Sequence, residues 1–317
     1  MVGTVTVIAA GGMFVVKHHQ RATNQYFKSL LSTSNHALSK IGYSVLPRGQ
    51  LLHGASKTPI RKLNLRDAFT SVALKGDNRS GKTIFLANTI LNDMFPWWYR
   101  YFFPPRGLFL TGTQKPLTID AWLKSQITTT EKDDPWANMM DLLGQRYDEQ
   151  RVRLLLHKVF KNHLPQLLQP QPSIIVVDQA EELMKAFRGD FLVAFYNLAK
   201  KGRDTDLFRL VMVINTDNAE NALKLTNGGN MFTVIEAPKV SRESVVERYD
   251  EKFAQIFDDC DSCIGVALDY QRSVAEGQTM NPKEYAAIRK EKYSRDNCLM
   301  VEISRDEFLK AGEHFQK

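Results

Sequence analysis

Short apolar runs alternate with longer segments of mixed polarity from about residue 70 onward. The short runs hold few polar positions, as in strands that are buried on both faces of a parallel sheet. They predict five strands, at residues 70–74, 107–111, 173–177, 210–215 and 232–236.

The segments between these runs carry apolar residues at helical spacing. We expect helices at residues 83–94, 141–163, 179–200 and in the segment from 241 onward. One face of the helix at 141–163 would be formed by Leu142, Tyr147, Leu154, Leu155, Val159 and Phe160.

This order predicts an α/β fold, with a doubly wound and mostly parallel five-stranded core, helices on both faces and a small helical lid. The expected domains are a basic arm at 1–66, the core at 67–240 and the lid at 241–317.

The first candidate for chemistry follows the first predicted strand. Its sequence, GDNRSGKT, fits the P-loop pattern G-x-x-x-x-G-K-[ST]. In such a loop backbone N–H groups point at phosphates, Lys82 reaches the β- and γ-phosphates, and the Thr83 hydroxyl ligates Mg²⁺. A chance match would occur in about 1% of chains of this length, but the strand before the loop and the helix after it favour a genuine P-loop. The predicted nucleotide-binding residues are Gly76, Asp77, Asn78, Arg79, Ser80, Gly81, Lys82, Thr83 and Ile84.

The second candidate is the carboxylate of Asp178, which directly follows the apolar run SIIVV. In P-loop enzymes a carboxylate at the end of a core strand helps to hold Mg²⁺. An apolar strand that ends in Asp is common by itself, but here it follows a P-loop in the expected order. Thr83 and Asp178 are therefore the predicted magnesium ligands.

The chain resembles the additional-strand P-loop ATPases of the AAA+ and STAND classes between about residues 63 and 249. The resemblance rests on GDNRSGKT, SIIVVDQAEE and LVMVINTDN. In that family the fourth core strand ends in a polar sensor residue near the γ-phosphate and the attacking water, and Asn215 is its match. The segment EAPKVSRESVVERY is similar to the family's passage from the last core strand into the lid helices.

Two departures from the family pattern predict slow hydrolysis. The family places a catalytic Glu directly after the strand-end Asp, whereas this chain has Gln179. Glutamine cannot accept a proton from water, so a general base would have to be Glu181 or Glu182. In addition, no arginine lies between Asn215 and Arg242, the region where the family has a trans-acting arginine finger. The nearest alternatives are Arg188, Arg203 and Arg209.

The sequence favours ATP over GTP because it contains no N-K-x-D motif, which would recognise guanine. By the resemblance, residues 56–67 and 241–249 are the regions expected to contact adenine.

The charge of the chain is concentrated in its first 66 residues. The net charge is +7, but residues 1–66 hold nine Lys and Arg and no acid, which leaves 33 basic against 35 acidic residues elsewhere. An uncharged segment at 1–16 precedes Lys17, His18, His19 and Arg21. It is shorter than the roughly 20 apolar residues of a spanning helix, and no basic region precedes it as in a secretory signal. A membrane anchor, which would leave the ATPase domain facing the cytoplasm, is favoured; organelle targeting, for example mitochondrial, and a segment buried in the fold stay open.

Two further segments admit a purely structural interpretation. Residues 95–106, FPWWYRYFFPPR, could pack in the core, contact a membrane or protein, or stack on single-stranded nucleic acid. The near-neutral main domain argues against extensive nucleic-acid contact. Cys260 and Cys263 form one CxxC, for which zinc would need two further ligands such as Cys298 and His314, so a structural role is favoured. Three cysteines provide no disulfide framework and suggest a reducing, intracellular compartment.

Together these features predict a Mg²⁺-dependent ATP-binding and ATP-hydrolysing protein that acts as a conformational switch or as an oligomeric remodeller, with a homo-oligomer or another protein as partner. One alternative is a nucleotide-binding interaction module that hydrolyses little. Another is a nucleic-acid-dependent ATPase that uses the basic arm.

Overall fold

The structure is a computed structural model that describes residues 71–88, 107–112, 118–126, 141–144, 150–152, 154–155, 173–215, 217–225, 231–298 and 303–314. The predicted basic arm, with its apolar 1–16 segment, and the aromatic segment 95–106 lie outside these residues. In the described ranges, no helix combines the length and the apolar character needed to cross a bilayer.

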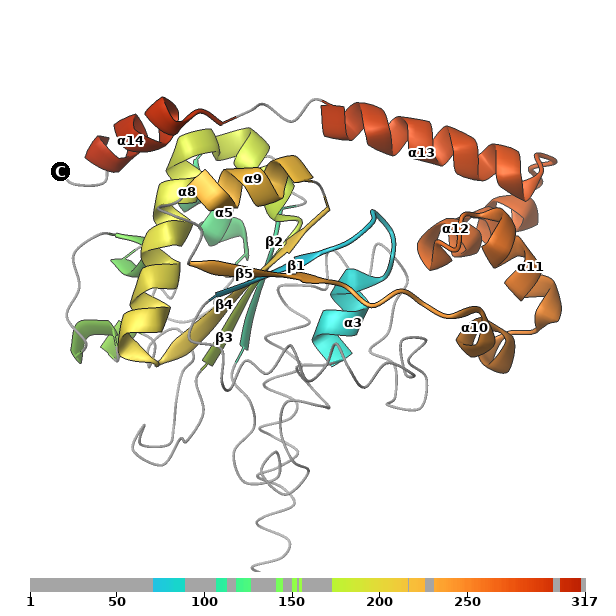
Figure 1. The fold of residues 1–317 in the computed structure, drawn as a ribbon, viewed down its shortest axis with the longest axis horizontal. Coiled ribbons are helices and arrows are strands. Elements are labelled where there is room, and N and C mark those ends of the chain that lie inside the picture. The colour runs from blue at the N-terminus through green and yellow to red at the C-terminus, as the bar shows by residue number, and fades with distance from the viewer. Residues whose placement is uncertain are drawn as a thin grey trace, which may run out of the picture.

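Five parallel strands form the centre of the fold (Figure 1). They are β1 (Ser71–Lys75), β2 (Gly107–Thr111), β3 (Ser173–Asp178), β4 (Phe208–Ile214) and β5 (Phe232–Glu236). Their order across the sheet is β2-β3-β4-β1-β5, and all four neighbouring pairs are parallel. The five predicted strands are confirmed, with ends that differ by at most two residues. Since the carboxyl ends of parallel strands share one edge, the segments after β1, β3 and β4 meet there.

Helices cover the sheet on both sides. In the described part of the core, the main helices are α3 (Lys82–Asn88), α5 (Ile119–Gln126), α8 (Ala180–Thr205) and α9 (Asp217–Leu225). Figure 1 shows α8 and α3 on opposite sides of the sheet. Ile175 and Val177 belong to the core cluster on the α8 side, while Ile174 and Val176 are buried as well. Burial of both residue sets is the result expected for a strand covered on both faces, so the α/β fold is confirmed.

The sheet and helices pack around large aromatic side chains. Trp122 of α5 meets Phe195 of α8 edge to face, with ring centroids 6.1 Å apart, and its indole N–H donates to the Thr111 carbonyl at the end of β2. Phe191 packs on Phe195 at 4.4 Å. These contacts pack the second half of α8 against the sheet.

Residues 240–298, within the predicted lid and called the lid below, form a second apolar cluster. Its helices are α10 (Arg242–Arg248), α11 (Glu251–Asp259), α12 (Ile264–Ala275) and α13 (Pro282–Cys298). Val245, Phe253, Phe257 and Ala267 are among its buried residues. The helical character predicted from residue 241 onward is therefore confirmed.

One more helix, α14 (Arg305–His314), returns to the core and packs on α8 (Figure 1). It meets α8 at Arg188, whose backbone leaves the helical conformation with φ 48° and ψ −123°. The Arg188 guanidinium pairs with Glu307 at 2.6 Å, and a Cβ on Gly189 would lie 2.7 Å from the Glu307 carbonyl oxygen. The helix predicted at 179–200 thus extends to Thr205 but has a break that its sequence pattern did not indicate.

The prediction of one continuous helix at 141–163 is wrong, because the helix is interrupted. Residues 141–143 are helical, but the backbone bends at Gly144, and helix is described again only at 150–152 and 154–155. Leu142 and Leu155 are buried as expected, whereas Leu154 is 54% exposed. The cause is tertiary, because Lys201 of α8 reaches the chain at this bend. Its ammonium donates to the carbonyls of Leu142, at 2.5 Å, and Gly144.

This contact predicts an alkaline gain in stability. Burial of Lys201, with a smaller effect from Arg151, lowers its pKa from 10.5 to about 8. A pKa lowered by folding means that the charged lysine destabilises the folded state. This cost disappears as the lysine loses its proton at higher pH. The unfolding free energy should therefore rise between pH 8 and 10.5 by about 3 kcal/mol relative to that of Lys201→Met. Urea unfolding of both proteins across this range measures the difference; parallel curves would show that the ammonium is as well solvated in the fold as in water.

Candidate functional site

The loop at residues 76–83 makes a tight turn between β1 and α3. The Ser80 N–H donates to the Asp77 carbonyl at 3.2 Å. Gly81 has φ 88°, which glycine adopts at little cost, and Arg79 has φ 64°, which costs an ordinary residue about 1–2 kcal/mol. Ile84, the last residue of the predicted binding segment, lies in α3. The chain therefore maintains a strained, compact loop at the carboxyl edge of the sheet.

Lys82 lies inside this loop. It is 6% exposed, and its ammonium donates to the carbonyls of Gly76 at 2.8 Å and Asp77 at 2.5 Å. Burial lowers the Lys82 pKa, while the nearby carboxylates of Asp178 and Glu181 raise it. The site thus holds one desolvated ammonium within a ring of acceptors and acidic groups.

Thr83 and Asp178, the two predicted magnesium ligands, are in direct contact although 95 positions separate them. The Thr83 hydroxyl donates to Asp178 Oδ2 at 2.7 Å, and Asp178 Oδ1 accepts from the Gln179 N–H at 3.0 Å. Asp178 is 3% exposed, and its pKa is raised by burial and lowered by the Thr83 hydroxyl and the Lys82 ammonium. A hydroxyl and a carboxylate offer the hard oxygen ligands that Mg²⁺ prefers.

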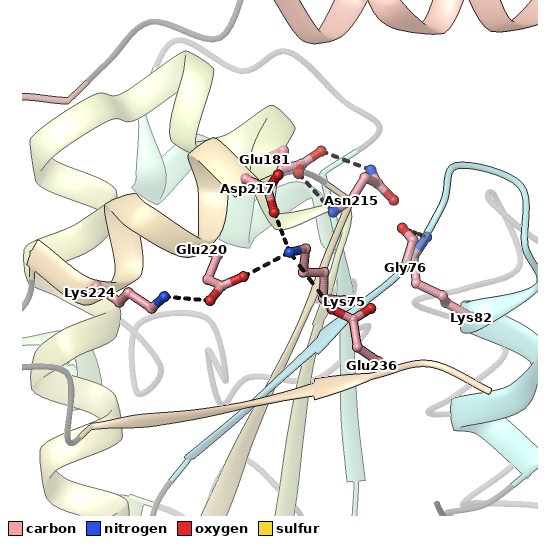
Figure 2. A network of polar contacts seen from close by, with 9 residues as sticks. All are labelled: Lys75, Gly76, Lys82, Glu181, Asn215, Asp217, Glu220, Lys224 and Glu236. Carbon is pink, nitrogen blue, oxygen red and sulfur yellow. Dashed lines mark hydrogen bonds and ion pairs between the residues drawn. The ribbon is translucent and has the colours of Figure 1, made fainter. Parts of the chain in front are cut away.

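Glu181 and Asn215 form a second contact at this edge (Figure 2). Glu181, in the first turn of α8, is 2% exposed. Its Oε1 accepts from the Asn215 backbone N–H at 2.7 Å, and its Oε2 accepts from Asn215 Nδ2 at 2.8 Å. Asn215 follows β4, which lies between β1 and β3. The structure therefore brings the predicted sensor residue and one of the two candidate bases together.

Glu182 lies outside this arrangement. Its carboxylate pairs with Lys185 at 3.1 Å, and its side chain is 43% exposed. Successive helical residues point about 100° apart, so only one of the two neighbouring glutamates can face the edge of the sheet. Of the two candidates that the sequence left open, the structure places Glu181 at the site.

Sequence reasoning missed the role of Lys75, the last residue of β1. Figure 2 shows its ammonium between acids from α9 and β5. It contacts Asp217, Glu220 at 2.9 Å and Glu236 at 3.7 Å. The hydrogen bonds that its ammonium donates to Asp217 and Glu220 raise the pKa of Lys75. Lys75 thus connects β1, α9 and β5 directly before the loop. The sequence marks Lys75 only as a lysine at the end of an apolar run, and nothing in the sequence marks Asp217, Glu220 and Glu236 as its partners.

A second set of unpredicted contacts joins the loop to the lid. The Arg79 guanidinium pairs with Asp269 of α12 at 2.8 Å, and the Arg79 carbonyl accepts from the Gly265 N–H at 3.1 Å. A Cβ on Gly265 would lie 2.5 Å from that carbonyl oxygen, so the backbones can approach this closely only at glycine. The Cys263 thiol donates to the Asn78 carbonyl at 3.5 Å.

Both cysteines of the CxxC pack in the apolar cluster of the C-terminal helices. Cys260 is buried, and burial raises its pKa to about 12; burial also raises the pKa of Cys263. Among the described residues, no group of three or more His, Cys, Asp and Glu could hold a metal ion. The side chains of Cys298 and His314, the other zinc ligands considered from the sequence, lie outside the description.

The three arginines considered as arginine fingers are engaged within the chain. Arg209 is buried at the start of β4, at the edge opposite the loop, and pairs with Asp206. Arg203 pairs with Asp204 at 3.1 Å, and Arg188 pairs with Glu307 as described above.

Comparisons with known proteins gave no match, either in a scan against models of protein families or in a search of curated proteins.

Proposed function

We propose that the protein binds ATP together with Mg²⁺ at the carboxyl edge of its sheet and hydrolyses it slowly. The observation that carries the proposal is the 2.7 Å contact between Thr83 and Asp178 beside the buried ammonium of Lys82. A lysine and a hydroxyl from the segment after β1, together with a carboxylate from the end of β3, are the groups that a nucleotide phosphate and its metal ion require.

Further features support a nucleotide as the ligand. The loop turns tightly around the Lys82 ammonium, which can donate to phosphate oxygens in place of the Gly76 and Asp77 carbonyls. The position of β4 between β1 and β3, with Asn215 at its end, supports the resemblance to additional-strand P-loop ATPases. The choice of ATP over GTP rests on the missing N-K-x-D motif.

Mg²⁺ would be held by Thr83 and Asp178 and would neutralise charge on the phosphates. Lys82 would add a second positive charge on the same phosphates, and Asn215 would contact water beside them. Each group is already located at the carboxyl edge of the sheet, but Lys82 and Thr83 would exchange their present hydrogen-bond partners for phosphate and metal.

Slow turnover agrees with the occupied side chains around the site. Gln179 replaces the usual glutamate, both Glu181 oxygens bind Asn215, and the three candidate arginines are paired within the chain. These observations favour a conformational switch over a fast motor. They are also compatible with a second candidate function, that of a nucleotide-binding interaction module that hydrolyses little ATP. Membrane attachment through residues 1–21 and an oligomeric or protein partner remain proposals from the sequence.

The Thr83→Val variant tests the magnesium site. Valine keeps the shape of threonine but removes the hydroxyl, so Mg²⁺ loses one ligand. We expect Mg²⁺ to increase the affinity of the wild type for ATP. The factor of this increase should be about tenfold smaller in Thr83→Val. Titration calorimetry with ATP, with and without Mg²⁺, measures both affinities.

Thr233→Val is the matched control, because Thr233 is exposed on β5. It should retain the wild-type response to Mg²⁺. ATP affinities that are the same with and without Mg²⁺ in wild type would contradict the proposed metal site, and the absence of any ATP binding would contradict the proposed function.

A further inference from the structure

The contact between Glu181 and Asn215 determines which way the Asn215 amide faces. A carboxylate has only acceptors, so the Asn215 group that donates to Glu181 Oε2 must be the amide nitrogen. The amide oxygen, Oδ1, is then directed away from Glu181 (Figure 2). The backbone N–H of Asn215 occupies the other carboxylate oxygen, so the pair is joined by two hydrogen bonds.

Asn215 is adjacent to the phosphate loop. The residue before it, Ile214, pairs with Lys75 in the sheet, and the Gly76 N–H donates to the Ile214 carbonyl at 3.3 Å. The Lys82 ammonium is close enough to Glu181 for the carboxylate to raise its pKa. The pair therefore lies between the end of β4 and the proposed position of the terminal phosphate.

The surroundings of Glu181 suit a fixed carboxylate better than a proton acceptor. It is 2% exposed and is engaged at both oxygens by one residue. A general base must hydrogen-bond the water that it deprotonates. Glu181 instead directs its hydrogen bonds to Asn215, whose remaining acceptor is turned outward.

We infer that Glu181 is a positioning residue that holds the Asn215 amide with Oδ1 toward the attacking water. This inference rests on the proposed function. Asn215 Oδ1 accepts a hydrogen bond from the water and orients its lone pair toward the terminal phosphorus. The water oxygen bonds to that phosphorus as the bridging P–O bond breaks. ADP leaves with the electron pair of that bond, and the water proton passes to an oxygen of the released phosphate.

An exchange of the two side-chain types tests the inference. In Glu181→Gln, the new amide nitrogen faces the Asn215 amide nitrogen, and Asn215 must turn its oxygen inward to avoid two opposed donors. In Asn215→Asp, two carboxylates face each other. Each single variant should lower kcat by about 10²-fold, as expected when one preorganised polar group is lost, with ATP affinity within about threefold of wild type.

The double variant Glu181→Gln/Asn215→Asp restores one donor and one acceptor and again turns an oxygen outward. Its kcat should return to within about tenfold of wild type. Glu182→Gln is the matched control; the same substitution at the neighbouring exposed residue should leave kcat and affinity unchanged. A double variant as inactive as Glu181→Gln, with normal ATP binding, would overturn the inference and favour Glu181 as the base.

Asn215→Ala provides an independent measurement if either exchanged variant fails to fold. Two residues that act through one group lose activity non-additively, so Glu181→Gln/Asn215→Ala should be no slower than Asn215→Ala alone. Losses that multiply would overturn the inference. Failure of the wild type to bind ATP would instead overturn the proposed function itself.

Discussion

Lys82→Ala is expected to lower ATP turnover by about 10²- to 10³-fold and to weaken ATP binding at least about tenfold. The Lys82 ammonium is already desolvated and held by two loop carbonyls, so it can meet phosphate charge without first losing its own water shell. Alanine leaves the same loop with no cation at that position. Phosphate release gives the turnover, and titration calorimetry gives the affinity.

Lys200→Ala is the matched control for this variant. Lys200 is exposed on α8, so its removal should leave both quantities unchanged. Thermal unfolding separates a loss of function from a loss of fold, because Lys82→Ala also deprives two carbonyls of their donor. Unchanged turnover and affinity in a folded Lys82→Ala protein would remove the basis for a phosphate site.

Asp178→Asn is expected to abolish most turnover, by about 10²-fold or more, while making the protein more stable. Burial raises the Asp178 pKa, so the ionised carboxylate costs free energy in the fold. Asparagine keeps the size and can retain the contacts with Thr83 and the Gln179 N–H without carrying that charge. Removing about 1 kcal/mol of this cost would raise Tm by about 2–4 °C at neutral pH.

The gain in stability should disappear at acidic pH. A carboxyl whose pKa is raised by folding costs stability only where it is ionised, so the advantage of asparagine shrinks as the pH falls toward the ordinary value of 3.8. Asp190→Asn, at an exposed position of α8, should change neither turnover nor Tm. A folded Asp178→Asn protein with normal turnover would show that another carboxylate holds the metal ion.

The parts of the fold that could be predicted are those determined locally. Buried strands leave uninterrupted apolar runs, and the loop from Gly76 to Thr83 has its own glycine pattern, so both were located to within two residues. The bend at Gly144 and the break at Arg188 could not be located this way. Each depends on a group more than 50 positions distant, Lys201 in the first case and Glu307 in the second.

The site was predictable in its residue types but not in its pairings. Asp178 and Thr83 were expected to share a metal ion; the structure shows a hydrogen bond between them, and the metal site stays a proposal. The choice between Glu181 and Glu182 required the position of Asn215, because adjacent residues on a helix have the same sequence environment. The contacts of Lys75 with Asp217 and Glu220 could not be predicted from the sequence, because these partners are about 140 positions away in the chain.

The contact of α12 with Arg79 couples the conformation of the loop to the position of the lid. The Gly265 N–H and the Asp269 carboxylate bind the carbonyl and guanidinium of a single loop residue. Any ligand that shifts the loop must therefore change the free energy of the lid's position, and any partner that moves the lid must change the ligand's affinity by the same factor. Under the proposed function, ATP binding at the loop would in this way alter the position of the C-terminal helices, and a partner could detect that change.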